Sequence, residues 1–195
     1  FNSAAGLNLP DLSGGSNGLQ AFAFTNGLPS KATVKGQLAS NPEVATALNG
    51  ANWWLRNAAG SRVQWTSAYG AYEVNITGWT KADASGRRFP QWKAEYDTKI
   101  FFSKLPLNFV QSDTVQMPSV TASWMVNGVD QQNTDATVQK TVRDGHVAYW
   151  AKMRALNPNL RIVGNVHMNW LPSAEMAGKL DGAFLEGTMG KSWSQ

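Results

Sequence analysis

Polar side chains close three short apolar runs in the second half of this sequence, and their types suit acid and base chemistry. An Asp ends the first run, an Asn and a His end the second, and a Glu ends the third. Two carboxyl groups beside an imidazole indicate proton transfer on a polar substrate. The residues are Asp113, Asn165, His167 and Glu186, in the runs 107–113, 161–167 and 182–187.

The two carboxylates predict glycoside hydrolysis. This reaction needs one carboxyl group to protonate the leaving oxygen and a second to act as nucleophile or base. We expect Glu186 to be the general acid or the nucleophile and Asp113 to be its partner. Simpler roles stay open, because Asp113 can form an Asx turn or a helix cap. For Glu186 the simpler role is an ion pair with a nearby Arg or Lys, which its position between Leu185 and Gly187 makes less favoured.

Side chains near these carboxylates are candidates for substrate binding. Asn165 and His167 are two positions apart on one run, so both point to the same side and can bond sugar hydroxyls. A structural role for His167 is the alternative. Trp124 and Trp170 offer flat indole faces on which sugar rings stack. The two His residues and the scattered carboxylates lack metal-ligand spacing, so we expect neither a metal nor a cofactor.

Each of the three runs is short and apolar, as in strands that are buried on both faces of a parallel sheet. The stretch 135–156 carries apolar residues at intervals of three and four, which predicts a long helix that Asp135 caps. In barrels and open α/β folds, chemistry takes place where the strands end. The sequence therefore predicts an α/β fold, a partial or truncated (β/α) TIM-type barrel with parallel strands.

Less regular segments precede these runs. Residues 1–20 are rich in Gly, Ser and Asn, which indicates a flexible N-terminal arm, and residues 21–195 form one α/β catalytic-type domain. Turn and periodicity signals predict a helix over 42–48, a hairpin over 53–65, a strand over 72–77 and a helix that begins at Pro90. The polar stretch 114–134 is expected to be a long loop that faces the substrate.

The charge and the hydrophobicity of the sequence limit the kinds of partner that we expect. The net charge is +4 and the 17 Lys and Arg residues form no run, so we expect no nucleic acid. The sequence contains no stretch of about 18 apolar residues, so we expect no membrane span.

With 195 residues the chain is shorter than a closed eight-stranded barrel of roughly 250 residues. We therefore expect a truncated or processed chain, whose open sheet edges are covered either by a homodimer partner or by the N-terminal arm. Without Cys the compartment stays open, and a secreted or periplasmic location is expected.

Several segments together resemble a known family. The stretches that carry the likeness are Arg143–Lys152, Arg154–Pro158, Gly164–Asn165 and Gly182–Glu186. They are similar to the hypothetical glycosyl hydrolase family 15, a group of bacterial β/α barrels. The likeness begins near Trp54-Leu55-Arg56, includes Asn75-Ile76-Thr77 and covers roughly residues 50–192. Related barrels carry an Asp-Gly-x-Phe-x-Asp pattern, of which Asp113 matches the last residue and the leading Asp-Gly is replaced.

The resemblance implies a β/α barrel that hydrolyses the glycosidic bonds of a polysaccharide. It adds Asn75 to the residues that we expect to bind the carbohydrate substrate. Two other functions remain open from the residues themselves. The chain can be a non-catalytic carbohydrate-binding protein that uses the same Trp residues, or an inactive barrel fragment.

Overall fold

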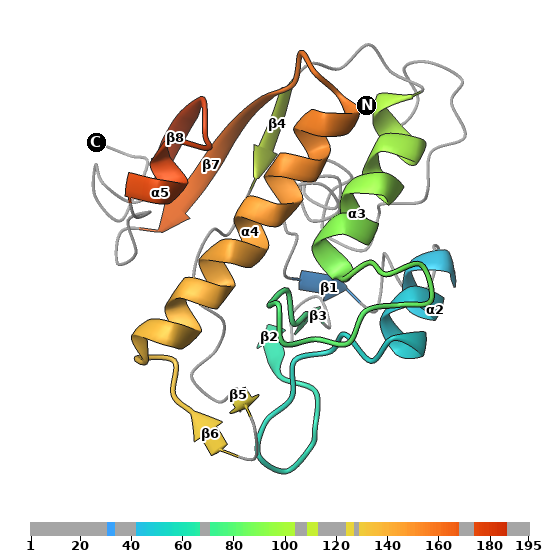
Figure 1. The fold of residues 1–195 in the computed structure, drawn as a ribbon, viewed down its shortest axis with the longest axis vertical. Helices are drawn as coiled ribbons and strands as arrows, with labels where there is room; N and C mark the ends of the chain where they lie inside the picture. The colour runs from blue at the N-terminus through green and yellow to red at the C-terminus, as the bar shows by residue number, and fades with distance from the viewer. Residues whose placement is uncertain are drawn as a thin grey trace.

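A computed structural model of the chain describes residues 31–33, 42–66, 71–103, 109–112, 124–126, 129–167 and 174–186. The predicted N-terminal arm, 1–20, lies outside these residues. In chain order the elements are β1 (Lys31–Thr33), α2 (Pro42–Gly50), β2 (Gln64–Thr66), β3 (Ala71–Glu73), α3 (Phe89–Asp97), the π-helix η2 (Thr98–Phe102), β4 (Phe109–Ser112), β5 (Trp124–Val126), β6 (Val129–Gln131), α4 (Ala136–Leu156), β7 (Arg161–His167), α5 (Ala174–Ala177) and β8 (Gly182–Glu186) (Figure 1).

β7 is the central strand of a parallel sheet with the order β4-β7-β8. The end of β4 pairs Ser112 with Gly164, and the end of β8 pairs Glu186 with His167. Both pairings are parallel, so the predicted parallel arrangement of these three runs is confirmed. The carboxyl ends of the three strands consequently point toward the same edge of the sheet.

The predicted partial TIM-type barrel is wrong. In the described part of the chain the strands form three separate sheets, of which only β4-β7-β8 is parallel. β1, β3 and β2 form an antiparallel sheet, and β5 and β6 form an antiparallel pair. A barrel of this type requires one continuous ladder of parallel strands joined by helices. The three-residue strands before residue 105 instead pair antiparallel, with β1 and β2 on either side of β3.

α4 is the longest element and confirms the predicted helix over 135–156. Its first half buries Val138 and Val142 in a core around Trp53 and Trp92. Its second half buries Trp150, with Tyr149 and Met153, in a core shared with β4 and β7. Figure 1 shows α3 and α4 side by side. The helix therefore joins the antiparallel part of the fold to the parallel sheet.

The stretch 114–134 is not the continuous loop that we expected. Trp124–Val126 and Val129–Gln131 form the antiparallel pair β5 and β6, and the remaining residues up to 123 lie outside the described part. Asp135 is the N-cap of α4, but its carboxylate accepts the Gln132 backbone N–H at 2.6 Å and makes no bond to the helix. The hairpin over 53–65 is present as a short bridge between Arg56 and Arg62.

Candidate functional site

The carboxyl edge of the parallel sheet holds the ends of β7 and β8. Glu186 is the backbone partner of His167, and Asn165 is the partner of Phe184. Glu186 and His167 are thus neighbours on two hydrogen-bonded strands, whose backbones lie about 4.8 Å apart. Ser112, the last residue of β4, lies level with Gly164, so β4 ends earlier along β7. Asp113 and Trp170 lie outside the described residues.

Asp181 fixes β8 beside β7 at the other end of these strands. Its carboxylate accepts the Ile162 backbone N–H at 2.8 Å, and its own backbone N–H donates to the Ile162 oxygen at 2.8 Å. Arg154 and Arg161 donate to the same carboxylate at 2.6 and 2.9 Å. The Ile162 N–H first, and then the two guanidinium groups, hold the pKa of Asp181 well below its usual range. This clamp sets the register that brings Glu186 opposite His167.

The end of β4 is attached to α4. The Trp150 indole N–H donates to the Ser112 hydroxyl at 2.9 Å, and both side chains are fully buried. A buried hydroxyl needs such a partner, since its desolvation is otherwise unfavourable. The bond therefore fixes Ser112, the last residue of β4, which immediately precedes Asp113 in the sequence.

Trp124 is not a stacking surface for a substrate. Its side chain is only 2% exposed and lies in the core with Val138 and Val142. Its indole N–H donates to the Asn133 amide oxygen at 2.5 Å, and its backbone N–H donates to Asp130 at 3.0 Å. The large indole of Trp124 is buried because it packs in the apolar core that includes Val138 and Val142 of α4.

Asn75, the other expected substrate ligand, lies in an open hollow of about 590 Å³. We call it the polar hollow, because most of its lining residues are polar. It lies between the 51–60 segment, the 75–81 segment and β6. Its lining residues are Ala51, Asn52, Trp54, Arg56, Asn57, Ala58, Gly60, Asn75, Trp79, Thr80, Lys81 and Asp130.

Hydrogen bonds order the side chains of this hollow. The Asn75 amide oxygen accepts the Thr77 backbone N–H at 3.1 Å and its hydroxyl at 2.7 Å. The Asn75 NH₂ group therefore faces away from this turn as a donor. Trp79 is half-buried and packs edge-on against Trp124, with ring centroids 6.4 Å apart. Arg56 is held by the Gly60 carbonyl at 2.7 Å and by the Asn52 side chain at 2.9 Å.

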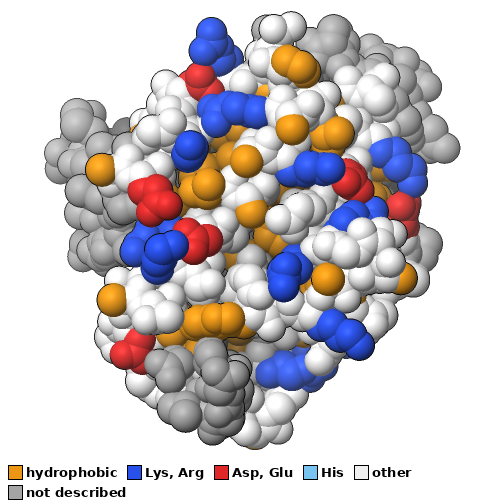
Figure 2. Space-filling model, in the orientation of Figure 1, with side chains coloured by type: hydrophobic (Ala, Val, Ile, Leu, Met, Phe, Trp, Pro, Cys, Tyr) orange, Lys and Arg blue, Asp and Glu red, His pale blue; other side chains and the backbone are white. Residues whose placement is uncertain are grey.

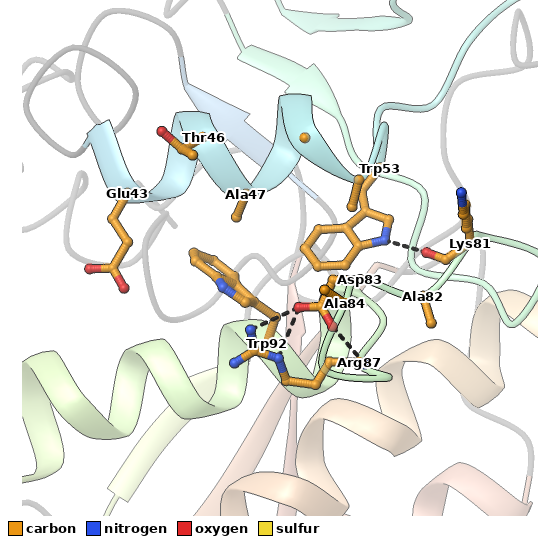
Figure 3. Close-up of a pocket in the computed structure, with 12 residues that line it drawn as sticks. Glu43, Thr46, Ala47, Trp53, Lys81, Ala82, Asp83, Ala84, Arg87 and Trp92 are labelled. Carbon is orange, nitrogen blue, oxygen red and sulfur yellow. Dashed lines mark hydrogen bonds and ion pairs between the residues drawn. The ribbon is translucent and has the colours of Figure 1, made fainter.

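A second hollow, of about 730 Å³, lies between α2 and the 81–87 segment (Figure 3). Trp53 and Trp92 line its inner side, and the Trp53 indole N–H donates to the Lys81 carbonyl at 2.9 Å. Asp83 and Arg87, which also line it, are paired at 2.8 Å. Figure 3 shows the Lys81 ammonium directed away from this pair. Lys81 lines both hollows, so its charge is available to the polar hollow.

A buried ionic cluster lies between α3 and α4, away from both hollows. The Lys93 ammonium contacts the two oxygens of Asp97 at 2.5 and 2.6 Å, and the Tyr149 hydroxyl donates to Asp97 at 2.7 Å. Burial raises the pKa of Asp97 and of Tyr149 and lowers the pKa of Lys93. None of the three lines either hollow, so we assign the cluster to the contact between the helices.

Comparisons of the chain with protein-family models, curated proteins and solved structures find no match. The likeness to the glycosyl hydrolase family therefore stays an interpretation of the sequence. No helix among the described residues is long and apolar enough to cross a membrane. Within the same residues, no group of three His, Asp or Glu side chains is arranged to hold a metal ion.

Sequence reasoning found Asn75 but missed most of the polar hollow. Trp79 and Lys81 belong to the 75–81 segment, whereas Asp130 comes from β6, far along the chain, and they meet only after β6 packs beside this segment. One local signal was readable: Asn75-Ile76-Thr77 has the spacing of an Asx turn, which leaves an amide NH₂ exposed at a chain reversal.

Proposed function

We propose that the chain is a glycoside hydrolase that acts on a polysaccharide, with Glu186 and Asp113 as its carboxylates. The observation that carries the proposal is the parallel register that pairs Glu186 with His167 at the carboxyl edge of β7 and β8. In open parallel sheets this edge is where ligands bind and chemistry is done. The mechanism needs two carboxyl groups that flank one bond, and it does not need a closed barrel.

The roles follow from the chemistry of the bond. Glu186 is proposed as the general acid or the nucleophile, and Asp113 as its partner. His167 and Asn165, on the neighbouring strand, are proposed to bond substrate hydroxyls, and Trp170 is proposed as a stacking surface. Asn75 is proposed to bind a more distant part of the substrate in the polar hollow.

The proposal is tested by reducing-sugar release across a panel of polysaccharides. Replacing Glu186→Gln keeps the size of the side chain and removes its ability to exchange a proton. We expect turnover to fall by about a hundredfold or more, because proton transfer contributes roughly that much. Binding of the same polysaccharide, measured separately, should stay within a factor of about two.

The matched control is Glu175→Gln, which removes an exposed carboxylate from α5 and should leave turnover unchanged. Equal turnover in the Glu186→Gln variant and the original chain would contradict the proposal.

A non-catalytic carbohydrate-binding protein is the second candidate. The polar hollow favours it, because an aromatic ring beside amide and carboxylate groups can hold a sugar without cleaving it. Binding of a polysaccharide with no release of reducing sugar by the unaltered chain would decide for this candidate.

A further inference from the structure

The polar hollow carries more positive than negative charge. Arg56 and Lys81 line it, and Asp130 is the one acidic residue among the described residues of its lining. Arg62 does not line the hollow but lies beside one of its lining residues, with its guanidinium 4.3 Å from the centre of the Trp54 ring. A charged ligand in this hollow would therefore be favoured as an anion.

Lys81 is the cation best placed to contact such a ligand. Arg56 is already held by the Gly60 carbonyl and by Asn52. The Lys81 side chain is exposed and makes no ion pair with another described residue. Its ammonium can therefore approach a bound anion without breaking an existing bond.

The remaining groups of the hollow suit a sugar ring. The Asn75 NH₂ group is a donor, the Asp130 carboxylate is an acceptor, and the half-buried Trp79 ring is held by its contact with Trp124. A polyphosphate or nucleic acid fits less well, because it needs several cations together. On the face shown in Figure 2, Lys and Arg side chains are spread out, and several have Asp or Glu beside them.

We infer that the polar hollow binds an acidic saccharide, with a uronate carboxylate near Lys81 and the sugar ring against Trp79. The inference takes the ligand class, carbohydrate, from the proposed function. It goes beyond the role proposed for Asn75, because it specifies the charge of the sugar bound in this hollow and the residues that recognise that charge and the sugar ring.

The test compares a galacturonate trimer with its fully methyl-esterified form, in which the same sugar rings carry neutral methyl esters in place of carboxylates. Calorimetric titration at low ionic strength should show the acid binding about fivefold more tightly, as one exposed ion pair allows. In Lys81→Gln the preference for the acid should disappear while the affinity for the ester is kept. About 0.5 M salt should also remove the preference in the unaltered chain, because it screens the charge.

Lys179→Gln is the matched control, because Lys179 is exposed and lines neither hollow; it should keep the preference. A second variant, Asn75→Asp, retains the oxygen that Thr77 bonds and adds a negative charge, so it should favour the ester. Failure to bind either trimer would overturn the inference, as would equal losses in Lys81→Gln and Lys179→Gln. Turnover without this charge preference would leave the glycosidase proposal standing, and the preference without turnover would leave the binding site standing.

Discussion

Lys93 and Asp97 form an ion pair that is almost entirely removed from water, with side chains 3% and 0% exposed. The attraction between the two charges offsets their desolvation only while both partners and their hydrogen bonds are present. The Tyr149 hydroxyl supplies one such bond from α4. The pair itself lies within α3, and the bond from Tyr149 to Asp97 connects it to α4. Loss of either charged residue should therefore weaken the contact between the helices.

We expect Asp97→Asn to lower the free energy of unfolding by about 3–5 kcal/mol, because it removes a carboxylate charge that directly contacts the buried Lys93 ammonium. Urea denaturation at neutral pH measures the change. The double variant Lys93→Met and Asp97→Leu removes both charges and should lose less stability, although it also removes the bond from the Tyr149 hydroxyl to Asp97. Equal losses in the single and double variants would contradict this explanation.

At the scale of single residues, the sequence predicts which chemical groups are present better than it predicts where each side chain lies in the fold. The types and spacing of His167 and Glu186 indicate a shared strand edge, and the register places their backbones side by side. Trp124 was misassigned, because an indole that serves the core and an indole that serves a ligand look alike in a sequence. Its burial depends on Val138 and Val142, which reach it only through the packing of α4.

At the scale of elements, α4 passes very close to the chain at Ile76. A Cβ added to Gly145 would lie 2.4 Å from the Ile76 carbonyl oxygen and 2.7 Å from its Cγ1. Only a residue without a side chain permits this approach of the helix to the segment that follows β3. The glycine thus positions both the helix and the nearby Asx turn of Asn75.

In Gly145→Ala the added methyl group overpacks the core, which should by itself lower the free energy of unfolding by about 1–3 kcal/mol. This loss opposes the gain of about 1 kcal/mol that Ala normally brings to a helix interior. Thermal and urea unfolding measure the balance. Gly178→Ala is the control, since the nearest atoms to its added Cβ lie 3.7 and 3.9 Å away. A Gly145→Ala protein that is more stable than the original chain would refute the close contact.

The Asp181 clamp predicts a dependence of stability on pH. The folded state depresses the pKa of this carboxyl, through the Ile162 N–H, Arg161 and Arg154. Its contribution is therefore fully present above the unfolded pKa of about 3.9 and is lost as the pH falls toward the folded value. Asp181→Asn should be less stable at neutral pH and should lose less stability on acidification from about pH 5 to pH 2.

Urea unfolding at several pH values measures this difference. Asp144→Asn, which removes the acidic member of an exposed pair with Lys140, should follow the original chain, because exposed pairs contribute little. Parallel curves for Asp181→Asn and the original chain would exclude the clamp as a source of acid sensitivity.

Long periodic elements were predictable, and short ones were not. The spacing of Val138, Val142 and Met153 defines α4, because a helix of this length repeats its apolar face many times. β5 and β6 have three residues each, too few to show alternation. Their pairing is decided by partners that meet in space, as in the bond from the Trp124 backbone to Asp130.

At the scale of the whole molecule, the local arrangement was predictable and the architecture was not. Three parallel strands with a helix between the first two are compatible with both a barrel and an open sheet, since closure depends on how the remaining strands pair. The strands before residue 105 pair antiparallel and form a sheet of their own. A homodimer that covers the edges of β4 and β8, and a secreted or periplasmic location, remain predictions.

The aromatic contacts of the core have a spectroscopic consequence. Trp92 stacks on Tyr96 with ring centroids 5.2 Å apart, and Trp53 lies 6.3 Å from Trp92. Rings held this rigidly in an asymmetric environment give strong near-ultraviolet circular dichroism, which vanishes when packing becomes fluid while helices persist. Near-ultraviolet circular dichroism can therefore distinguish a variant that has lost one contact from a variant whose core has lost its fixed packing.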